Sequence, residues 1–370
     1  MKKVLFLSPL PPPDYGSAMS SKACLDILKG SNDFEVHSIK LNYSKQISDI
    51  GRINLQKLLG LMRVKRQIKE EFSKFHPEVV YFVPATSGFG LIRDYLFVKQ
   101  VKKSFKGNIL FHVRSRILED DWRNKKNNKI LRDMFLNSKV IVLGNVLKKD
   151  LHGIVEDKDL FVLPNAVENE ISDKEFNDIL KDRKKIKDPE ILFLSNMDET
   201  KGWLKVLESC KILKERSTKA HFSFVGEWPS DKESKKFFKF LDDNSLKESV
   251  SYLGKKTGPE KDSILKNSGI LVFPTEYPLE TFGRVIIEAM MFGIPVIANG
   301  IATIPDIIDD KKTGFILEKN TPEEIAEKIE ILLKDKRLRE QMGKAGRNKF
   351  LERYTLKDYS GKFLQIFNQI

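Results

Sequence analysis

The chain contains one short pattern twice, as Lys3-Val4-Leu5-Phe6-Leu7-Ser8 and again as Glu190-Ile191-Leu192-Phe193-Leu194-Ser195. Each copy is a run of four apolar residues that begins after a charged residue, ends at a serine and leads into a polar loop. A short continuous apolar run is typical of a strand that is buried on both faces of a parallel sheet. The two copies therefore predict two parallel sheets, each built from its own half of the chain.

Short apolar runs alternate with longer helical patterns along the whole sequence, which is typical of strand–helix–strand units. The first half contains six candidate strands, at Val4–Ser8, Phe34–Ile39, Val79–Val83, Ile109–Val113, Val140–Leu143 and Leu160–Leu163. The second half contains six more, at Ile191–Ser195, His221–Val225, Val250–Leu253, Ile270–Phe273, Val296–Ala298 and Phe315–Leu317. The pattern predicts an α/β fold with two Rossmann-like domains.

A charged run from Lys181 to Lys187 separates the two series of strands and is predicted to be a linker. We expect an N-terminal domain over residues 1–180, a linker over 181–189 and a C-terminal domain over 190–355. The segment 356–370 is predicted to be a helix that joins the N-terminal domain. A capping box with proline at the first helical position, Thr321-Pro322-Glu323-Glu324, predicts another helix start.

Composition and charge limit the function classes. The 370 residues are 41% hydrophobic, enough for two cores, and the formal net charge of +13 is compatible with nucleic acid, an anionic membrane or phosphorylated substrates. The two cysteines, Cys24 and Cys210, have no disulfide or zinc spacing. No uncharged apolar stretch approaches the roughly 18 residues of a membrane span. We expect a cytoplasmic protein, and peripheral association with the inner face of the cell membrane stays open.

Two basic segments lie in the first half of the chain. From Arg52 to Lys74, seven basic and two acidic residues give +5, and the apolar residues between them follow an amphipathic helical pattern. Such a helix can lie on an anionic membrane surface, or it can pack its apolar stripe on the sheet and leave a basic face in solvent. The second segment, Lys99 to Lys139, includes Trp122-Arg123-Asn124-Lys125-Lys126. Both segments favour a phosphate-bearing acceptor in a membrane, such as a lipid-linked saccharide.

Several catalytic motifs are absent from the sequence. It has no GxGxxG fingerprint, no GxxxxGK[ST] loop and no HExxH pattern, which argues against a dinucleotide dehydrogenase, a P-loop NTPase and a zinc hydrolase. Asp157-Lys158-Asp159 has a carboxylate spacing that some metal-dependent sugar transferases use, but it directly precedes a strand and is interpreted as a solvated loop. No metal site is predicted.

Two glutamates frame the start of a predicted buried helix. Glu288 is surrounded by apolar residues between Phe282 and Phe292, so its carboxylate needs partners, and Glu280 lies in the loop before that helix. A helix N-terminus favours anions such as phosphate. The alternative is a core carboxylate paired with a lysine or with backbone donors, and a solvated loop glutamate.

The sequence around these glutamates is Pro274-Thr-Glu-Tyr-Pro-Leu-Glu280-Thr-Phe-Gly283-Arg-Val-Ile-Ile-Glu288-Ala-Met290, followed by Gly293-Ile-Pro-Val-Ile-Ala298. It resembles the Glu-x7-Glu signature of the retaining glycosyltransferases of family 4 with both of its flanks. Further matches are Pro164-Asn165, Lys201-Gly202, Gly226, Gly254, Pro305-Asp306 and Gly314. The resemblance implies the GT-B fold, with two Rossmann-like domains whose parallel sheets face across a cleft, the N-terminal one for the acceptor and the C-terminal one for a nucleotide sugar.

The resemblance also implies roles for individual residues. Glu280 would contact hydroxyls of the transferred sugar, and Glu288 would accept both hydroxyls of the ribose. The backbone N–H groups of Phe282 and Gly283 would hold the diphosphate, and Lys201 would neutralise it as it leaves. His112 is expected near the sugar, although a lone histidine after an apolar strand can equally be a satisfied core residue. The remaining candidates for donor binding are Thr281, Asn196, Gly16, Gly226 and Pro274.

The sequence departs from the family pattern at three places. Asn196 stands where relatives usually have an arginine, so that Arg284 or a lysine of the first domain would have to help Lys201 with the diphosphate. Ala302-Thr303 replaces the paired glycines common before Pro305, and the loop from Pro11 to Ser17 contains one glycine, Gly16, where two are typical.

The expected function is therefore a metal-independent, retaining hexosyltransferase that uses a UDP- or GDP-linked sugar as co-substrate and needs no cofactor. The acceptor would be a saccharide or a lipid-linked saccharide in bacterial surface polysaccharide or glycolipid synthesis. A GT-B-type nucleotide-sugar isomerase and a non-catalytic basic binding protein are the alternatives. Nucleic-acid binding is not expected, because the aromatic residues are not interleaved with the basic runs. Donor base, donor sugar, acceptor, linkage and oligomeric state are left open.

Overall fold

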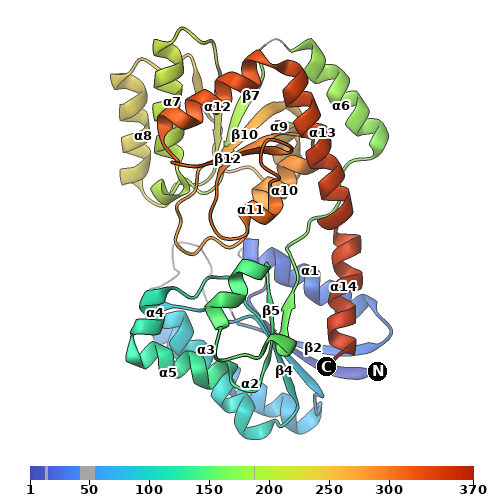
Figure 1. Cartoon of the computed structure of the whole chain (residues 1–370). Coiled ribbons are helices and arrows are strands. Elements are labelled where there is room, and N and C mark those ends of the chain that lie inside the picture. Colours follow the sequence, from blue (N-terminus) through green and yellow to red (C-terminus); the bar gives the residue numbers. More distant parts are fainter. Residues whose placement is uncertain (13–15, 42–54, 187) are drawn as a thin grey trace. The chain divides into compact units, whose positions relative to one another are not determined.

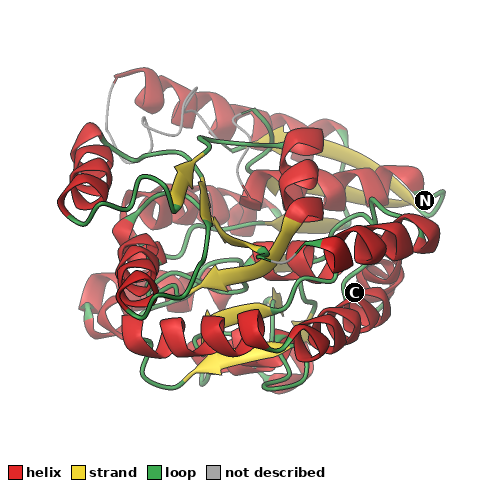
Figure 2. Ribbon diagram, turned by 90° about the horizontal axis from the view of Figure 1, so that it is seen from above, coloured by secondary structure: helices red, strands yellow, loops and turns green. Residues whose placement is uncertain are grey.

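Two six-stranded parallel sheets carry the fold, each with helices on both of its faces (Figures 1 and 2). The computed structural model describes residues 1–12, 16–41, 55–186 and 188–370. The chain divides into unit 1, with Met1–Asn165 and Tyr359–Ile370, and unit 2, with Ala166–Asp358. All twelve predicted strands are present, which confirms the predicted α/β class with two Rossmann-like units.

Unit 1 has the strand order β2-β1-β3-β4-β5-β6. Its strands are β1 (Lys2–Ser8), β2 (Phe34–Lys40), β3 (Val79–Phe82), β4 (Asn108–His112), β5 (Lys139–Val142) and β6 (Leu160–Val162). Its helices are α1 (Gly16–Gly30), α2 (Leu55–Lys74), α3 (Gly88–Ser104), α4 (Glu119–Arg123), α5 (Lys125–Phe135) and the 3-10 turns η2 (Asn145–Leu151) and η3 (Asp157–Asp159). The predicted C-terminal helix is α14 (Leu356–Asn368), whose Phe363 and Phe367 pack against Tyr81 of β3.

Unit 2 has the strand order β12-β11-β10-β7-β8-β9, with β7 and β10 side by side at its centre. Its strands are β7 (Glu190–Leu194), β8 (Phe222–Val225), β9 (Val250–Tyr252), β10 (Ser268–Phe273), β11 (Val296–Asn299) and β12 (Gly314–Leu317). Its helices are α6 (Asp173–Lys185), η4 (Glu199–Lys201), α7 (Trp203–Glu215), α8 (Asp231–Asp243), α9 (Gly258–Asn267), α10 (Arg284–Met291), α11 (Ile304–Ile307), α12 (Pro322–Lys334) and α13 (Lys336–Arg353). Helix α12 starts as predicted, with the Thr321 hydroxyl accepting the N–H of Glu324.

The linker predicted over residues 181–189 is not where the structure divides the chain, because the division lies between Asn165 and Ala166. The charged run from Lys181 to Lys185 forms the last turns of α6, and Ser172 and Glu175 make a capping box at the start of that helix. The run is highly charged because most of this face of α6 is exposed, while Leu180 is buried. Residues 166–189 therefore belong to unit 2.

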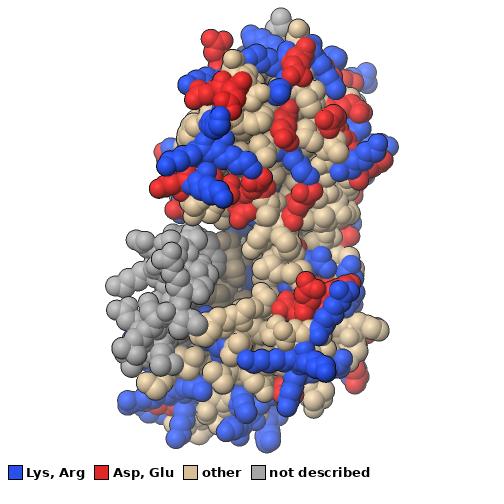
Figure 3. All heavy atoms as spheres, turned by 90° about the vertical axis from the view of Figure 1, so that its left-hand side faces the viewer, with Lys and Arg blue, Asp and Glu red and all other residues tan. Residues whose placement is uncertain are grey.

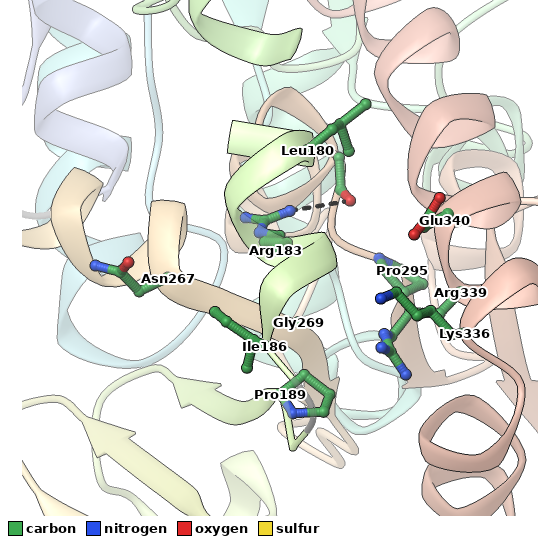
Figure 4. A pocket seen from close by; sticks show the side chains of 11 residues that line it. Leu180, Arg183, Ile186, Pro189, Asn267, Gly269, Pro295, Lys336, Arg339 and Glu340 are labelled. Atoms are coloured by element: carbon green, nitrogen blue, oxygen red, sulfur yellow. Dashed lines mark hydrogen bonds between the residues drawn. The ribbon is translucent and has the colours of Figure 1, made fainter. Parts of the chain in front are cut away.

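Arg183 fixes α6 to the rest of unit 2. Its guanidinium donates to the carbonyls of Leu265 and Lys266 in the last turn of α9, at 2.6 and 3.0 Å. It also donates to the carbonyls of Phe292 and Gly293 after α10, at 2.7 and 3.2 Å. One cation thus satisfies carbonyls at the C-terminal ends of two helices. Figure 4 shows Arg183 in the small pocket between α6 and α13, with Arg339 and Lys336 nearby.

Replacing Arg183 with leucine is expected to destabilise the protein by about 3 kcal/mol, because buried carbonyl groups lose their donors. Burial, and then the charge of Arg339, lower the pKa of Arg183 to about 9, so the guanidinium is still charged at neutral pH. The loss should lower the Tm by about 5–10 °C in a thermal unfolding scan. Lys181→Ala is the matched control, since this lysine lies on the exposed side of the same helix and should leave the Tm unchanged. Equal Tm values for the two variants would contradict the capping role.

The basic amphipathic segment predicted from Arg52 to Lys74 is helix α2 in its described part, which starts at Leu55. Residues 52–54 lie outside the described residues, and so do the side chains of 55–59. Val64 and Ile68 are buried in unit 1, where α2 packs on α3 and β2, and Arg63, Arg66 and Lys69 are on the solvent side. The structure therefore supports the packing interpretation of this stripe.

Candidate active site

The candidate site of unit 2 lies at the carboxyl ends of β7 and β10. The strand order reverses between these two strands, and in open α/β sheets ligands bind at such a switch point. The loop after β7 leads through η4 to Lys201, and the loop after β10 runs from Pro274 to Gly283. The glutamate loop and the predicted lysine thus meet at one edge of the sheet.

Glu280 and Lys201 form the central contact of this site. Lys201 Nζ lies 2.9 Å from Glu280 Oε2, and the two side chains are only 15% and 12% exposed. The ammonium group also lies 3.9 Å from the centre of the Tyr277 ring, a cation–π contact. A partly buried pair of this kind holds both charged groups in fixed positions. The sequence had not indicated Tyr277, because one aromatic residue in a loop carries no distinctive pattern.

The second oxygen of Glu280 occupies the start of α10. Oε1 accepts the N–H groups of Thr281, Phe282 and Gly283, at 3.2, 3.4 and 3.1 Å. Two of these are the donors that the sequence resemblance assigns to the diphosphate. In this structure they bind the Glu280 carboxylate, which stands where the helix N-terminus favours an anion. An anionic ligand that uses the same donors has to share them with Glu280 or displace it.

Glu288, on α10, is 6% exposed, and its buried charge has two cationic partners. Its Oε1 lies 3.0 Å from Lys261 Nζ of α9 and 3.2 Å from Arg284 Nε one turn earlier. The contacts are those of the alternative interpretation, a core carboxylate paired with a lysine. Arg284, the cation considered as help for Lys201, is engaged with Glu288 instead.

Two glycines of the site are required by the backbone. Gly283 precedes α10 with a φ of +69°, in the left-handed region that other residues rarely adopt. At Gly226, after β8, a Cβ atom would overlap the Ser195 carbonyl oxygen at the end of β7. A side chain at Gly226 would push the loop after β7 away from the sheet. Pro274 is buried directly after β10, and its carbonyl accepts the Asn320 amide at 3.3 Å.

The places where the sequence departs from the family pattern have defined geometry. Asn196 is exposed in the loop after β7. Ala302, in place of a glycine, has a φ of +49°, so the backbone keeps the left-handed conformation that glycine favours. The Thr303 hydroxyl donates to the Thr281 carbonyl at 2.6 Å. This hydrogen bond ties the glutamate loop to the residue before α11. Sequence reasoning had not assigned Thr303 a function.

Two predicted site residues lie in unit 1. His112 is the last residue of β4 and is fully buried, with Nδ1 2.7 Å from the Tyr81 hydroxyl. Gly16 is the exposed first residue of α1. Residues 13–15 of the loop before it lie outside the described residues. Sequence reasoning did not indicate Tyr81, which is one residue of an ordinary apolar strand.

The described residues contain neither a membrane-spanning helix nor a cluster of metal ligands. None of the described helices is long and apolar enough to span a membrane. Within the same ranges, no three His, Cys, Asp or Glu side chains are grouped as metal ligands. In the Asp157-Lys158-Asp159 sequence, which was interpreted as a solvated loop, Asp159 pairs with Lys139 at 2.8 Å.

Most of unit 2 is similar to a known family. Residues 175–349, which include most of α6 and the whole glutamate loop, match the family model described as glycosyl transferases group 1. The chain is 27% identical over 275 residues to the poly(ribitol-phosphate) alpha-N-acetylglucosaminyltransferase of Staphylococcus aureus, a match that covers 74% of this chain and 52% of that protein. It is 32% identical over 149 residues to the sulfoquinovosyl transferase SQD2 of Arabidopsis thaliana, covering 40% and 28%. The chain thus spans about half or less of these curated relatives.

Solved structures match along the whole chain. The sucrose-phosphate synthase of Thermosynechococcus elongatus matches with a TM-score of 0.77 at 16% identity, covering 100% of this chain and 99% of that one. HepE of Anabaena, solved in complex with UDP-glucose, matches with a TM-score of 0.75 at 14% identity and covers 100% of both chains. The fold is therefore the GT-B fold of glycosyltransferases, as the sequence predicted.

Proposed function

We propose that the chain is a retaining, metal-independent glycosyltransferase of family 4 type, which transfers a sugar from a UDP- or GDP-linked donor to a saccharide or lipid-linked acceptor. The observation that carries this proposal is the Glu280–Lys201 pair beside the N–H groups of Thr281, Phe282 and Gly283 at the switch point of unit 2. It combines a carboxylate for sugar hydroxyls with a cation and backbone donors for phosphate. The group 1 match includes these residues, and HepE was solved with UDP-glucose.

Each group would act where charge changes during transfer. As the bond from the anomeric carbon to the diphosphate breaks, negative charge grows on the departing oxygen, and Lys201 would stabilise it more strongly than the ground state. Glu280 would hold the sugar by accepting hydrogen bonds from its hydroxyls. The departing phosphate oxygen would take the proton of the acceptor hydroxyl on the same face, which retains the anomeric configuration. Lys201 would supply the positive charge that a metal ion supplies in other transferases, so activity should persist in EDTA.

For the other predicted residues, contact with the donor is proposed from the resemblance. Glu288 would accept the ribose hydroxyls through its second oxygen, and Thr281, Asn196, Gly226 and Pro274 would shape the donor pocket. From unit 1, His112 and Gly16 would contribute to sugar and phosphate binding. Surface polysaccharide or glycolipid synthesis is the proposed process, which fits the poly(ribitol-phosphate) enzyme among the relatives.

Nucleotide binding is expected to raise the Tm, because a ligand at 100 times its Kd stabilises the folded state by about 2.7 kcal/mol. Thermal-shift measurements with UDP, GDP and ADP and with their sugars identify the base. Glu288→Gln should reduce the shift, because it removes the charge that would bind the ribose. Glu260→Gln is the matched control and should keep the full shift in Tm. Glu260 is an exposed residue of α9 that pairs with Lys256. The absence of a shift with all three nucleotides would count against the proposed donor class.

The acceptor is proposed to carry phosphate. In unit 1 the end of α4 and most of α5 form a concave surface with one indole, four cations and one carboxylate, made by Trp122, Arg123, Lys125, Asn128, Lys129, Arg132 and Asp133. On the face in Figure 3, the charged side chains in the part of the surface that belongs to unit 1 are mostly Lys and Arg. One relative's name specifies poly(ribitol-phosphate), a polymer with repeated phosphates.

Sedimentation with liposomes tests whether the phosphate is presented by a membrane. More wild-type protein is expected to sediment with vesicles that contain anionic lipid than with neutral vesicles, and the difference should decrease with salt. Lys125→Glu/Lys129→Glu should abolish the difference. Lys232→Glu/Lys235→Glu makes the same change in charge on α8 of unit 2. This variant should keep the difference in sedimentation between anionic and neutral vesicles. Equal recovery of wild type in the supernatant with both vesicles would contradict membrane presentation.

A further inference from the structure

A buried polar cluster in unit 1 surrounds His112. The imidazole is fully buried at the carboxyl end of β4, and its Nε2 has no hydrogen-bond partner among the described residues. Nδ1 is satisfied by the Tyr81 hydroxyl at 2.7 Å. A buried polar atom without a partner is costly, and native structures keep few of them. Because the carboxyl ends of parallel strands are where ligands bind, Nε2 is a candidate contact for a substrate atom.

Arg114 sets the direction of the short hydrogen bond between the Tyr81 hydroxyl and His112 Nδ1. Its Nη2 lies 3.4 Å from His112 Nδ1 and 3.5 Å from the Tyr81 hydroxyl oxygen. A guanidinium only donates, so a proton on Nδ1 would face a cation, whereas a lone pair there is attracted to it. With the lone pair on Nδ1, the Tyr81 hydroxyl donates to Nδ1 and its oxygen faces Arg114. The imidazole proton is then on Nε2.

The other neighbours do not reverse this assignment. The Cys24 thiol lies 3.2 Å from Arg114 Nη2 and 3.0 Å from the Tyr359 hydroxyl, and the Ser17 carbonyl accepts from Arg114 at 3.4 Å. Burial, and then the charge of Arg114, hold the pKa of His112 well below its usual value, so the ring is neutral at physiological pH. Burial raises the pKa of Tyr81 well above its usual value, so its hydroxyl keeps the proton that it donates.

We propose that Tyr81 is a positioning residue that fixes His112 as the neutral Nε2–H tautomer, so that His112 serves the reaction as a hydrogen-bond donor to a substrate oxygen and not as a general base. The identity of that oxygen as part of a sugar rests on the proposed function. The Tyr81 ring is itself held in place, stacked on Phe6 with 4.5 Å between centroids and in contact with Phe363 and Phe367. Removing only its hydroxyl should therefore leave the ring where it is.

Nitrogen NMR of protein labelled at its five histidines tests the proposal, with the His112 signals assigned by their loss in His112→Gln. In the wild type we expect an unprotonated Nδ1 and a protonated Nε2 that do not titrate between about pH 5 and 8. Tyr81→Phe removes the 2.7 Å bond and leaves Nδ1 only the 3.4 Å contact with Arg114, so the tautomer with the proton on Nδ1 should become populated beside the other. It should lower kcat about tenfold, within the range of a lost hydrogen bond in a transition state, with KM nearly unchanged.

Tyr359→Phe is the matched control, because it removes a hydroxyl from the same cluster that contacts Cys24 and not His112. It should leave both the tautomer and kcat as in the wild type. A wild-type ring protonated on Nδ1, or the same tautomer in wild type and Tyr81→Phe, would overturn the proposal. These spectra are recorded without substrate. If the protein transfers no sugar, the proposed function is refuted, while the spectra still decide which nitrogen of His112 carries the proton.

Discussion

Replacing Glu280 with glutamine is expected to leave a folded protein whose kcat for sugar transfer is lower by a factor of about 100 or more. Glutamine has the same shape, and its oxygen can still accept the N–H groups of Thr281 and Gly283. Its amide nitrogen would then face Lys201, a donor opposite a cation, and the sugar hydroxyls would lose a charged acceptor. Steady-state kinetics with the donor identified by thermal shift measure the loss, and circular dichroism shows whether the fold is kept.

Glu276→Gln is the matched control for this substitution. Glu276 belongs to the same loop after β10, and it pairs with Lys205 while its side chain is 53% exposed. Its variant has the same change in charge at a position that is not part of the switch-point contact. We expect kcat within about twofold of wild type. Full turnover by Glu280→Gln, or equal losses in both variants, would remove Glu280 from its proposed role.

Replacing Lys201 with methionine is expected to lower kcat by about 100-fold to 1000-fold, with a smaller change in KM. The reason is that the ammonium group would act on the charge that develops as the diphosphate departs. Methionine has a similar length and can keep the contact with the Tyr277 ring. Single-turnover kinetics at saturating donor separate the chemical step from donor binding.

The control is Lys205→Met. Lys205 lies four residues after Lys201, and it pairs with Glu276 and not with Glu280. The effects of Glu280→Gln and Lys201→Met should not add, because the two groups are in contact and position each other. A double variant with the product of both losses would show that the pair does not act as a unit. A Lys201→Met enzyme that loses only donor affinity would contradict leaving-group stabilisation.

The strands were predictable because a parallel strand buried on both faces is a continuous apolar run, such as residues 191–194. The glutamate loop was predictable because Glu288 is a carboxylate among the apolar residues of Val285–Met291. The division between the units was not predictable from the sequence, because the charged run at Lys181–Lys185 looks like a linker. What keeps that run in unit 2 is Arg183, whose partners are carbonyls of residues far along the chain.

Contacts that depend on the conformation of the backbone could also not be predicted from the sequence. That Glu280 binds the N–H groups of its own loop depends on the turn before Gly283, and the resemblance instead assigned two of those groups to phosphate. The link between Tyr81 and His112 joins neighbouring strands, and nothing in either strand's sequence indicates which residues are paired. Only the assembled sheet brings the two side chains together.

The most direct test of the account is the anomeric configuration of the product. With a donor whose sugar is α-linked to the nucleotide, proton NMR of the product formed at early times should show an α-linked sugar on the acceptor, and release of the nucleoside diphosphate should depend on the acceptor. A β-linked product, or a sugar nucleotide that is isomerised or hydrolysed at the same rate with and without acceptor, would contradict it.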